Sequence, residues 1–173
     1  YRLAARHGTP RVLFSAHGLP RKFVETGDGY QHQVEQTVAA MVAALAMDEL
    51  DYAICYQSRV GRMEWLRPYT DHEIARAGAD GVPLVVVPVA FVSEHSETLV
   101  ELDIEYAELA RAAGVPAYER VATAGTEPAF ISGLARLVRH ALDGPAGTVS
   151  AAGGRICPAG FGACIHAPGD RGG

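Results

Sequence analysis

The sequence predicts an α/β fold, a parallel sheet of about four strands with helices on both faces. Short apolar segments alternate with longer segments of helical periodicity, in units of about 30 residues. Residues 84–90 are apolar at every position, which is typical of a strand covered by helices on both sides. Polar residues cluster directly after three of the apolar segments, where open α/β sheets bind their ligands.

Four segments have the composition of buried strands, and the last of them is the weakest. They are 11–15, 52–57, 84–90 and 117–121. A helical segment lies between each of these strands and the next. The connections are therefore expected to be right-handed crossovers, which make the strands parallel.

Four other segments carry apolar residues at helical spacing or helix-start signals: 30–50, 70–77, 94–114 and 126–143. Thr70 is the expected N-cap of the second helix, and Gly114 is the expected end of the third. We expect the last helix to pack through the apolar face formed by Phe130, Leu134, Leu137, Val138 and Ala141.

The length of 173 residues suits one domain, preceded by a lead-in at 1–10 and followed by a tail at 146–173. The domain itself is expected at 11–145. The tail is rich in Gly, Ala and Pro and has no clear period. Because the chain begins with Tyr1 and not Met, we expect it to be a piece of a longer protein whose upstream half is missing.

Composition excludes several classes of protein. A net charge of −5 argues against a nucleic-acid surface, and no apolar run approaches the length of a membrane-spanning helix. The three cysteines are Cys55, Cys157 and Cys164, too few and too scattered for a disulfide framework. They indicate a reducing compartment, and a cytoplasmic location is expected, with peripheral membrane contact left open.

Functional groups follow three of the predicted strands. The first strand ends at Ser15 and His17, the second at Gln57, and the third is followed by Phe91 and a polar segment that contains His95 and Glu97. The carboxyl ends of parallel strands meet at one edge of a sheet, so we expect these side chains to converge. A lone His after a strand is more often structural, but the convergence favours a site.

An acidic stripe follows the third strand. Its members are spaced by three, four, four and three residues: Glu94, Glu97, Glu101, Glu105 and Glu108. Like charges at these spacings repel one another by a few tenths of a kcal/mol per pair. A solvated acidic face is the simpler interpretation. The position of the stripe at a strand end, beside His95, favours a path or site for a hard cation.

Several kinds of site are poorly supported. The chain has no G-x-S-x-G elbow, no G-x-G-x-x-G, no P-loop and no His-Glu-x-x-His. A mixed His and carboxylate site remains, suited to proton transfer or to a loosely held divalent metal.

Four blocks of the sequence resemble the ferrochelatase family, which inserts ferrous iron into protoporphyrin in the last step of haem synthesis. The blocks are FSAHGLP at 14–20, YQSRVG at 56–61, WLRPYTD at 65–71 and PVAFVSEHSETLVELD at 88–103. They occur in family order, and the resemblance extends from about residue 13 to residue 142. It implies two similar chelatase-like, Rossmann-like α/β domains with a porphyrin cleft between them, of which this chain is the C-terminal one.

The resemblance also implies residue roles. It assigns catalysis to His17, Glu97 and His95, porphyrin binding to Phe91, Trp65 and Ser15, and metal binding to His17, Glu97, Glu101 and Glu105. We expect His17 to accept a proton from a porphyrin nitrogen and the acidic row to deliver the metal. The division between base and metal ligand stays open at this stage.

Two features depart from the family pattern. Glu94 stands where the family usually has Asp. Cys157 and Cys164 lie where some ferrochelatases carry cysteines for a [2Fe–2S] cluster, which usually takes four thiolates. His166 could supply a third ligand, whereas Cys55 is expected in the core. The alternative is a tail whose thiols bind no metal.

Two other functions remain open. The chain could be a non-catalytic metal- or porphyrin-binding fragment, because half of the expected cleft is absent. It could also belong to a related chelatase that uses coproporphyrin or cobalt.

Overall fold

The computed structural model describes residues 1–147, 150 and 152–164. Four parallel strands form one sheet, in the order β2 (Tyr52–Gln57), β1 (Arg11–His17), β3 (Leu84–Val89) and β4 (Tyr118–Arg120). The predicted α/β class and parallel sheet are confirmed. β1 runs two residues beyond its expected end, so that His17 belongs to the strand itself.

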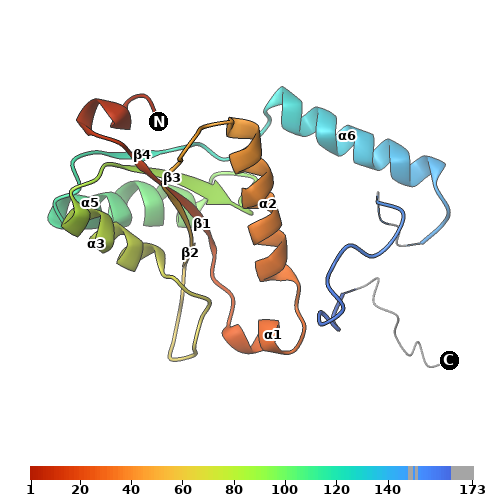
Figure 1. Cartoon of the computed structure of the whole chain (residues 1–173). Coiled ribbons are helices and arrows are strands. Elements are labelled where there is room, and N and C mark those ends of the chain that lie inside the picture. The colour runs from red at the N-terminus through yellow and green to blue at the C-terminus, as the bar shows by residue number, and fades with distance from the viewer. Residues whose placement is uncertain (148–149, 151, 165–173) are drawn as a thin grey trace.

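Helices cover both faces of the sheet (Figure 1). On one face α2 (Tyr30–Leu45) packs Val34 and Val38 against the strands. On the other face, α3 (Thr70–Asp80) and α5 (Tyr106–Ala112) enclose a second core cluster. The central strand β1 serves both clusters, because its alternate residues point to opposite faces.

The remaining helical elements are short, except for the last. They are η1 (Ala4–His7), α1 (Arg21–Glu25), α4 (Ser96–Leu99), the π-helix η2 (Glu101–Glu105) and α6 (Pro128–Asp143). The lead-in is anchored to the domain, since Ala4 on η1 is fully buried in the first core cluster. The helix expected over 30–50 ends earlier, where Ala46 turns to a left-handed conformation with φ of 47°.

The helices α3 and α5 approach each other closely at a glycine. A Cβ atom placed on Gly78 would lie 2.1 Å from the carbonyl oxygen of Ala113. Only a residue without a side chain fits between the two backbones, so Gly78 sets how tightly α5 lies against α3.

The prediction of a single α-helix over 94–114 was wrong. The segment forms three elements, α4, η2 and α5. In η2 the N–H of Glu105 bonds to the carbonyl of Val100, five residues back, which is the wider π pattern. The cause is tertiary: Leu102 is fully buried and its carbonyl accepts a hydrogen bond from the hydroxyl of Tyr118 on β4 at 2.9 Å.

The last helix also differs from expectation. Its periodicity correctly predicts a helix, but α6 stands away from the sheet and none of its residues is buried (Figure 1). Ile131, Leu134, Leu137, Val138 and Leu142 are between 43% and 78% exposed. The amphipathic pattern therefore marks a face that no described part of this chain covers.

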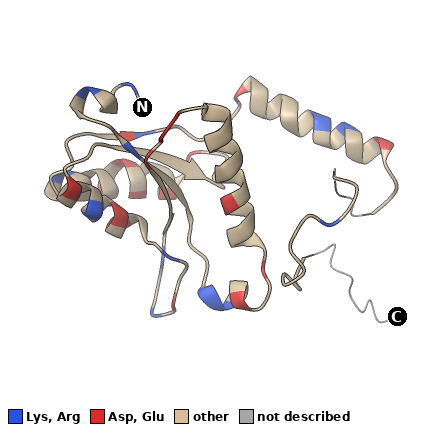
Figure 2. Cartoon of the chain, in the orientation of Figure 1, with Lys and Arg blue, Asp and Glu red and all other residues tan. Residues whose placement is uncertain are grey.

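Charged residues of both signs are interspersed over the elements in the view of Figure 2. Arg11, at the start of β1, is mostly buried, and it donates to Asp51 at 2.9 Å and to Asp80 at 2.7 Å. These contacts tie the amino end of β1 to the loop before β2 and to the last residue of α3. Within the described residues, no helix is long and apolar enough to cross a membrane.

The strand order places a topological switch point between β1 and β3. The chain leaves β1 toward β2 on one side and returns past β1 to β3 on the other. In open α/β sheets, ligands bind outside the carboxyl ends of the strands at this point. The residues that end β1 and follow β3 are therefore the ones expected to contact a ligand.

Candidate functional site

His17 ends β1 with its ring in a defined protonation pattern. Its Nδ1 lies 2.6 Å from the carbonyl oxygen of Gly18. A carbonyl oxygen only accepts, so Nδ1 carries the proton and donates it. In the neutral ring, Nε2 then holds a lone pair. The side chain is 40% exposed, so that this lone pair is accessible from the edge of the sheet.

Glu97 approaches this lone pair from the other side of the switch point. Its Oε1 lies 3.4 Å from Nε2 of His17, and its side chain is 38% exposed. The pair can share a proton, or can offer a cation one nitrogen and one oxygen ligand. Among the residues that the structure describes, no group of three or more His, Cys, Asp or Glu side chains is arranged to hold a metal ion.

His95 caps the helix that carries Glu97. Its Nδ1 accepts a hydrogen bond from the N–H of Glu97 at 3.2 Å, and its own N–H donates to Oγ1 of Thr98 at 2.9 Å. This is a capping box with a histidine in the usual place of Ser or Thr. Because Nδ1 accepts, the proton of the neutral ring is on Nε2.

Phe91 packs near both histidine rings. Its centroid lies 6.4 Å from that of His17 and 5.3 Å from that of His95. It is only 8% exposed. A buried aromatic ring therefore lies beside both imidazoles.

Glu101 is held by four hydrogen bonds. Its Oε1 accepts from the N–H of Ser58 at 2.8 Å and from the hydroxyl of Tyr106 at 3.0 Å. Its Oε2 accepts from Gln57 at 3.0 Å and from the Ser58 hydroxyl. Burial, together with the charge of Glu101, raises the pKa of Tyr106, so this phenol remains a donor. Glu101 thus anchors η2 to the end of β2.

Glu94, the first acid of the stripe, pairs with a cation that the helical spacing of the stripe did not reveal. Arg120, at the end of β4, donates to Glu94 at 2.6 Å and to Asp103 at 2.7 Å. Desolvation raises the pKa of Glu94, but hydrogen bonds from the Thr123 N–H, from Thr98 and from Arg120 outweigh it and lower the pKa to about 2. Glu94 is therefore a structural anion that holds the loop after β3.

The other expected site residues lie at different depths. Ser15 is fully buried, with its hydroxyl 2.8 Å from both Gln57 and Thr70, so it supports the site from below and is not accessible to a substrate. Thr70 was expected to be the N-cap of α3, and this prediction was wrong: the N-cap is Tyr69, and Thr70 is the first residue of the helix. Glu105 is exposed at the end of η2.

Trp65 is 7% exposed and donates from Nε1 to the carbonyl of Val60 at 3.1 Å. A Cβ atom placed on Gly18 would lie 3.1 Å from the Trp65 ring and 2.9 Å from the carbonyl oxygen of Gln57. The indole therefore packs directly on the peptide that orients His17.

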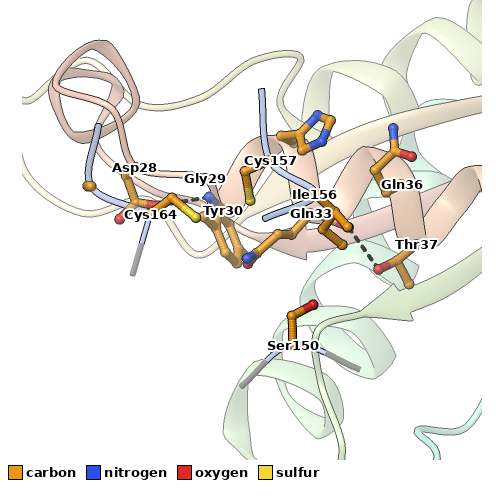
Figure 3. A pocket seen from close by; sticks show the side chains of 12 residues that line it. Asp28, Gly29, Tyr30, Gln33, Gln36, Thr37, Ser150, Ile156, Cys157 and Cys164 are labelled. Atoms are coloured by element: carbon orange, nitrogen blue, oxygen red, sulfur yellow. Dashed lines mark hydrogen bonds between the residues drawn. The ribbon is translucent and has the colours of Figure 1, made fainter. Parts of the chain in front are cut away.

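The cysteines divide into a core residue and a pair in the tail. Cys55 is fully buried in β2, where desolvation raises the pKa of its thiol to about 12. Cys157 and Cys164 line a cavity of about 600 Å³ beside Tyr30 at the start of α2 (Figure 3). A hydrogen bond with Cys164 raises the pKa of Cys157. His166, the third conceivable ligand, lies outside the described residues.

The structure thus brings together His17, His95, Glu97 and Phe91, and it leaves the cysteine pair elsewhere. Sequence reasoning placed Gln57 among the groups at the site edge without a specific role, and it gave Tyr106 and Arg120 no role in the site. Gln57 had a usable signal, since it is the last residue of a buried strand beside the predicted site. Arg120 binds acids 17 and 26 residues away, so no local pattern identifies it. Tyr106 contacts Glu101 five residues back, a spacing that a regular α-helix does not bring together.

The chain is similar to ferrochelatases of bacteria. The family model described as Ferrochelatase matches residues 2–142. The ferrochelatase of Caulobacter vibrioides is 53% identical over 154 residues, which cover 89% of this chain and 44% of that protein. The ferrochelatase of Wolbachia pipientis wMel is 53% identical over 137 residues, which cover 79% of this chain and 42% of that protein. The ferrochelatase of Rickettsia bellii is 47% identical over 158 residues, which cover 90% of this chain and 44% of that protein. The chain spans less than half the length of these curated relatives.

A solved structure shares the fold at low sequence identity. It is described as a cobalamin (vitamin B12) biosynthesis CbiX protein from Marinobacter aquaeolei VT8. The TM-score is 0.53 with 19% identity, and the match covers 77% of this chain and 97% of that one. The similarity supports the architecture of the sheet and its helices.

Proposed function

This chain belongs to the ferrochelatase family, and on that premise we propose that the complete protein inserts ferrous iron into protoporphyrin IX. In this proposal the chain is the C-terminal part of the enzyme and carries the metal-inserting edge of the porphyrin cleft. The observation that supports it is the pair formed by Nε2 of His17 and Oε1 of Glu97, 3.4 Å apart at the switch point of the sheet.

Metal insertion requires the two pyrrole N–H groups of the porphyrin to lose their protons. His17 is the group we assign to accept a proton, because its Nδ1 is occupied by the Gly18 carbonyl and its Nε2 keeps a lone pair, 3.4 Å from Glu97. His95 presents an N–H at Nε2 and is not arranged as a base. We assign it to hold the start of α4, and with it Glu97, in place.

Ferrous iron is a substrate that must exchange water for protein ligands on its way to the porphyrin. Carboxylates are suitable ligands for this exchange. Glu105 is exposed and Glu97 is half-exposed, so we assign them as outer and inner acceptors. Glu101 would have to give up four hydrogen bonds to bind a metal. We therefore assign it to hold the row in position, which changes the role expected from its spacing.

The rest of the protein is proposed to close the cleft. Two features support this: the chain spans 44% of the Caulobacter vibrioides relative, and the apolar face of α6 is uncovered. We propose that an N-terminal domain of the same protein faces His17 and Glu97 across the porphyrin.

A [2Fe–2S] cluster does not fit the described residues alone. Cys157 and Cys164 supply two of the usual four thiolates, and the buried Cys55 is unsuited to a third. The tail cysteines therefore require further ligands before they can hold such a cluster, and no step of the proposed reaction depends on one. Iron and sulfide analysis of the purified complete protein would decide its presence.

The assignment of the site is tested by insertion of Zn²⁺ or Fe²⁺ into protoporphyrin, followed by its absorption spectrum in the complete protein. We expect His17→Ala and Glu97→Gln each to lower kcat by about 100-fold or more. The matched controls are His7→Ala and Glu108→Gln, which change exposed residues outside the site and should keep the wild-type rate. A wild-type rate in both site variants would show that the assignment is wrong.

Two further measurements address the alternatives. A chain of residues 1–173 assayed by itself should bind metal or porphyrin with little turnover, because half of the proposed cleft is missing. Turnover near the level of the complete protein would contradict the need for a partner domain. Parallel assays with coproporphyrin and with Co²⁺ would identify a related chelatase if either substrate exceeded protoporphyrin and Fe²⁺ in kcat/KM.

A further inference from the structure

Gln57 ends β2 and is fully buried. Its Nε2 donates to the carbonyl oxygen of Glu97 at 2.8 Å and to Oε2 of Glu101 at 3.0 Å. Its Oε1 accepts from the hydroxyl of Ser15 at 2.8 Å. Because a carbonyl oxygen only accepts, the amide nitrogen must face Glu97. The orientation of the Gln57 side chain is therefore fixed by its neighbours.

The backbone of the same residue contacts the other half of the pair. Gln57 is the register partner of His17 across β1 and β2. Its carbonyl accepts from the N–H of Gly18 at 2.7 Å, and the carbonyl of Gly18 accepts from Nδ1 of His17 at 2.6 Å. Gln57 thus contacts Gly18, whose carbonyl orients His17, with its backbone, and it contacts the carbonyl of Glu97 with its side chain.

A buried chain of donors supports the amide from below. Since Ser15 donates to Gln57, the hydroxyl of Thr70, 2.8 Å away, must donate to Ser15. All three of these residues are fully buried. A fully satisfied buried network is rigid, because any rearrangement leaves a polar group without a partner. Gln57 is therefore well suited to hold the residues that it contacts in fixed positions.

We propose that Gln57 is a positioning residue whose side-chain amide sets the separation between Nε2 of His17 and the carboxylate of Glu97. This inference rests on the proposed function, because the separation matters only if both groups act on one substrate. Gln57 itself touches neither porphyrin nor metal in this role. A misplacement of about 1 Å in such a pair lowers a rate by up to about 100-fold.

Two variants of the complete protein separate positioning from stability. Gln57→Leu removes every polar contact of the side chain. Gln57→Glu keeps the shape but places a carboxyl group against the carbonyl of Glu97 and the carboxylate of Glu101. Two carboxyl groups in contact take up a proton at higher pH than an isolated one, and that proton restores one donor. The matched control is Gln36→Leu, an exposed glutamine on α2.

The readout is Zn²⁺ insertion into protoporphyrin at pH values from about 8 down to about 5.5, with each rate divided by that of the wild type. Gln57→Leu should lower kcat by about 10- to 100-fold at every pH, with KM for porphyrin within about twofold. The relative rate of Gln57→Glu should rise as the pH falls. Thermal unfolding of each variant shows whether it is folded. The pH dependence of the Gln57→Glu rate, divided by the wild-type rate, can be measured even if only part of that variant is folded.

Failure of this inference differs from failure of the proposed function. If His17→Ala lowers the rate while Gln57→Leu matches the wild type, Gln57 does not position the pair. A folded Gln57→Glu variant that matches the wild-type rate across this pH range also overturns the inference. If His17→Ala itself matches the wild type, the proposed site is wrong, whatever Gln57 does.

Discussion

His17 and His95 carry the protons of their neutral rings on opposite nitrogens. Nδ1 of His17 donates to the carbonyl of Gly18, whereas Nδ1 of His95 accepts from the N–H of Glu97. At Nε2 the first ring therefore presents a lone pair and the second an N–H. The two imidazoles near Phe91 are not interchangeable, and their substitutions should have different consequences.

Substitutions of His95 should distinguish its contribution as an N-cap from other contributions of its ring. Asn is a good N-cap and accepts the same N–H, whereas Ala accepts nothing. We expect His95→Ala to lower the free energy of unfolding by about 1 kcal/mol and His95→Asn to lower it by much less. Denaturant unfolding of both variants measures the difference. Equal losses would show that the cap contributes nothing.

The pairing of Glu94 with the N–H of Thr123, with Thr98 and with Arg120 should make the stability of the fold depend on pH in the acid range. The pKa of Glu94 is lowered from 4.5 to about 2, so the folded state binds its proton less readily than the unfolded state. This stabilisation is complete above pH 4.5 and is lost as the pH falls toward 2. The Tm of the wild type should therefore fall more steeply over this range than that of Glu94→Gln. Parallel Tm curves would contradict the pairing, and Glu108→Gln is the exposed control.

A methyl group on Gly18 should disturb the site directly. It would lie 2.9 Å from the carbonyl oxygen of Gln57 and 3.1 Å from the Trp65 ring. We expect Gly18→Ala to lower the free energy of unfolding by about 1 to 3 kcal/mol and to reduce metal insertion. Gly133→Ala is the control, because nothing lies within 4 Å and Ala favours a helix. A Gly18→Ala variant as stable as the wild type would show that the close approach relaxes freely.

The cysteines should differ in reactivity toward iodoacetamide. Cys55 is fully buried and burial raises its pKa to about 12, so very little thiolate is present at pH 8. Cys157 is partly exposed. Mass spectrometry should find Cys157 alkylated in the folded protein and Cys55 alkylated only after unfolding. Rapid labelling of Cys55 under native conditions would show that β2 opens readily.

The sheet and its site edge were predictable because their signals are local. The apolar run of β3, the polar residues after it, and His17 at the end of β1 each follow from neighbouring residues and strand geometry. The same holds for the existence of α6, whose periodicity is clear.

The π-helix, the partner of Glu94 and the packing of α6 were not predictable, since each depends on residues far away in the sequence. η2 widens where Tyr118 and Ser58 bind Leu102 and Glu101 from two different strand ends. A helical wheel assumes a constant turn and contains no information about such partners. Apolar periodicity likewise predicts a face for α6 without showing what covers it.

The strand order also has a consequence for synthesis of the chain on the ribosome. β1 lies between β2 and β3. Leu84, at the start of β3, follows Arg11 by about 70 residues, so β3 is synthesised long after β1 and β2. At ordinary translation speeds of about 5 to 20 residues per second, the apolar edge of β1 stays unpaired for several seconds. A product that ends before β3 would keep this edge open. Such a product should aggregate readily, whereas one that ends after β4 has the complete sheet.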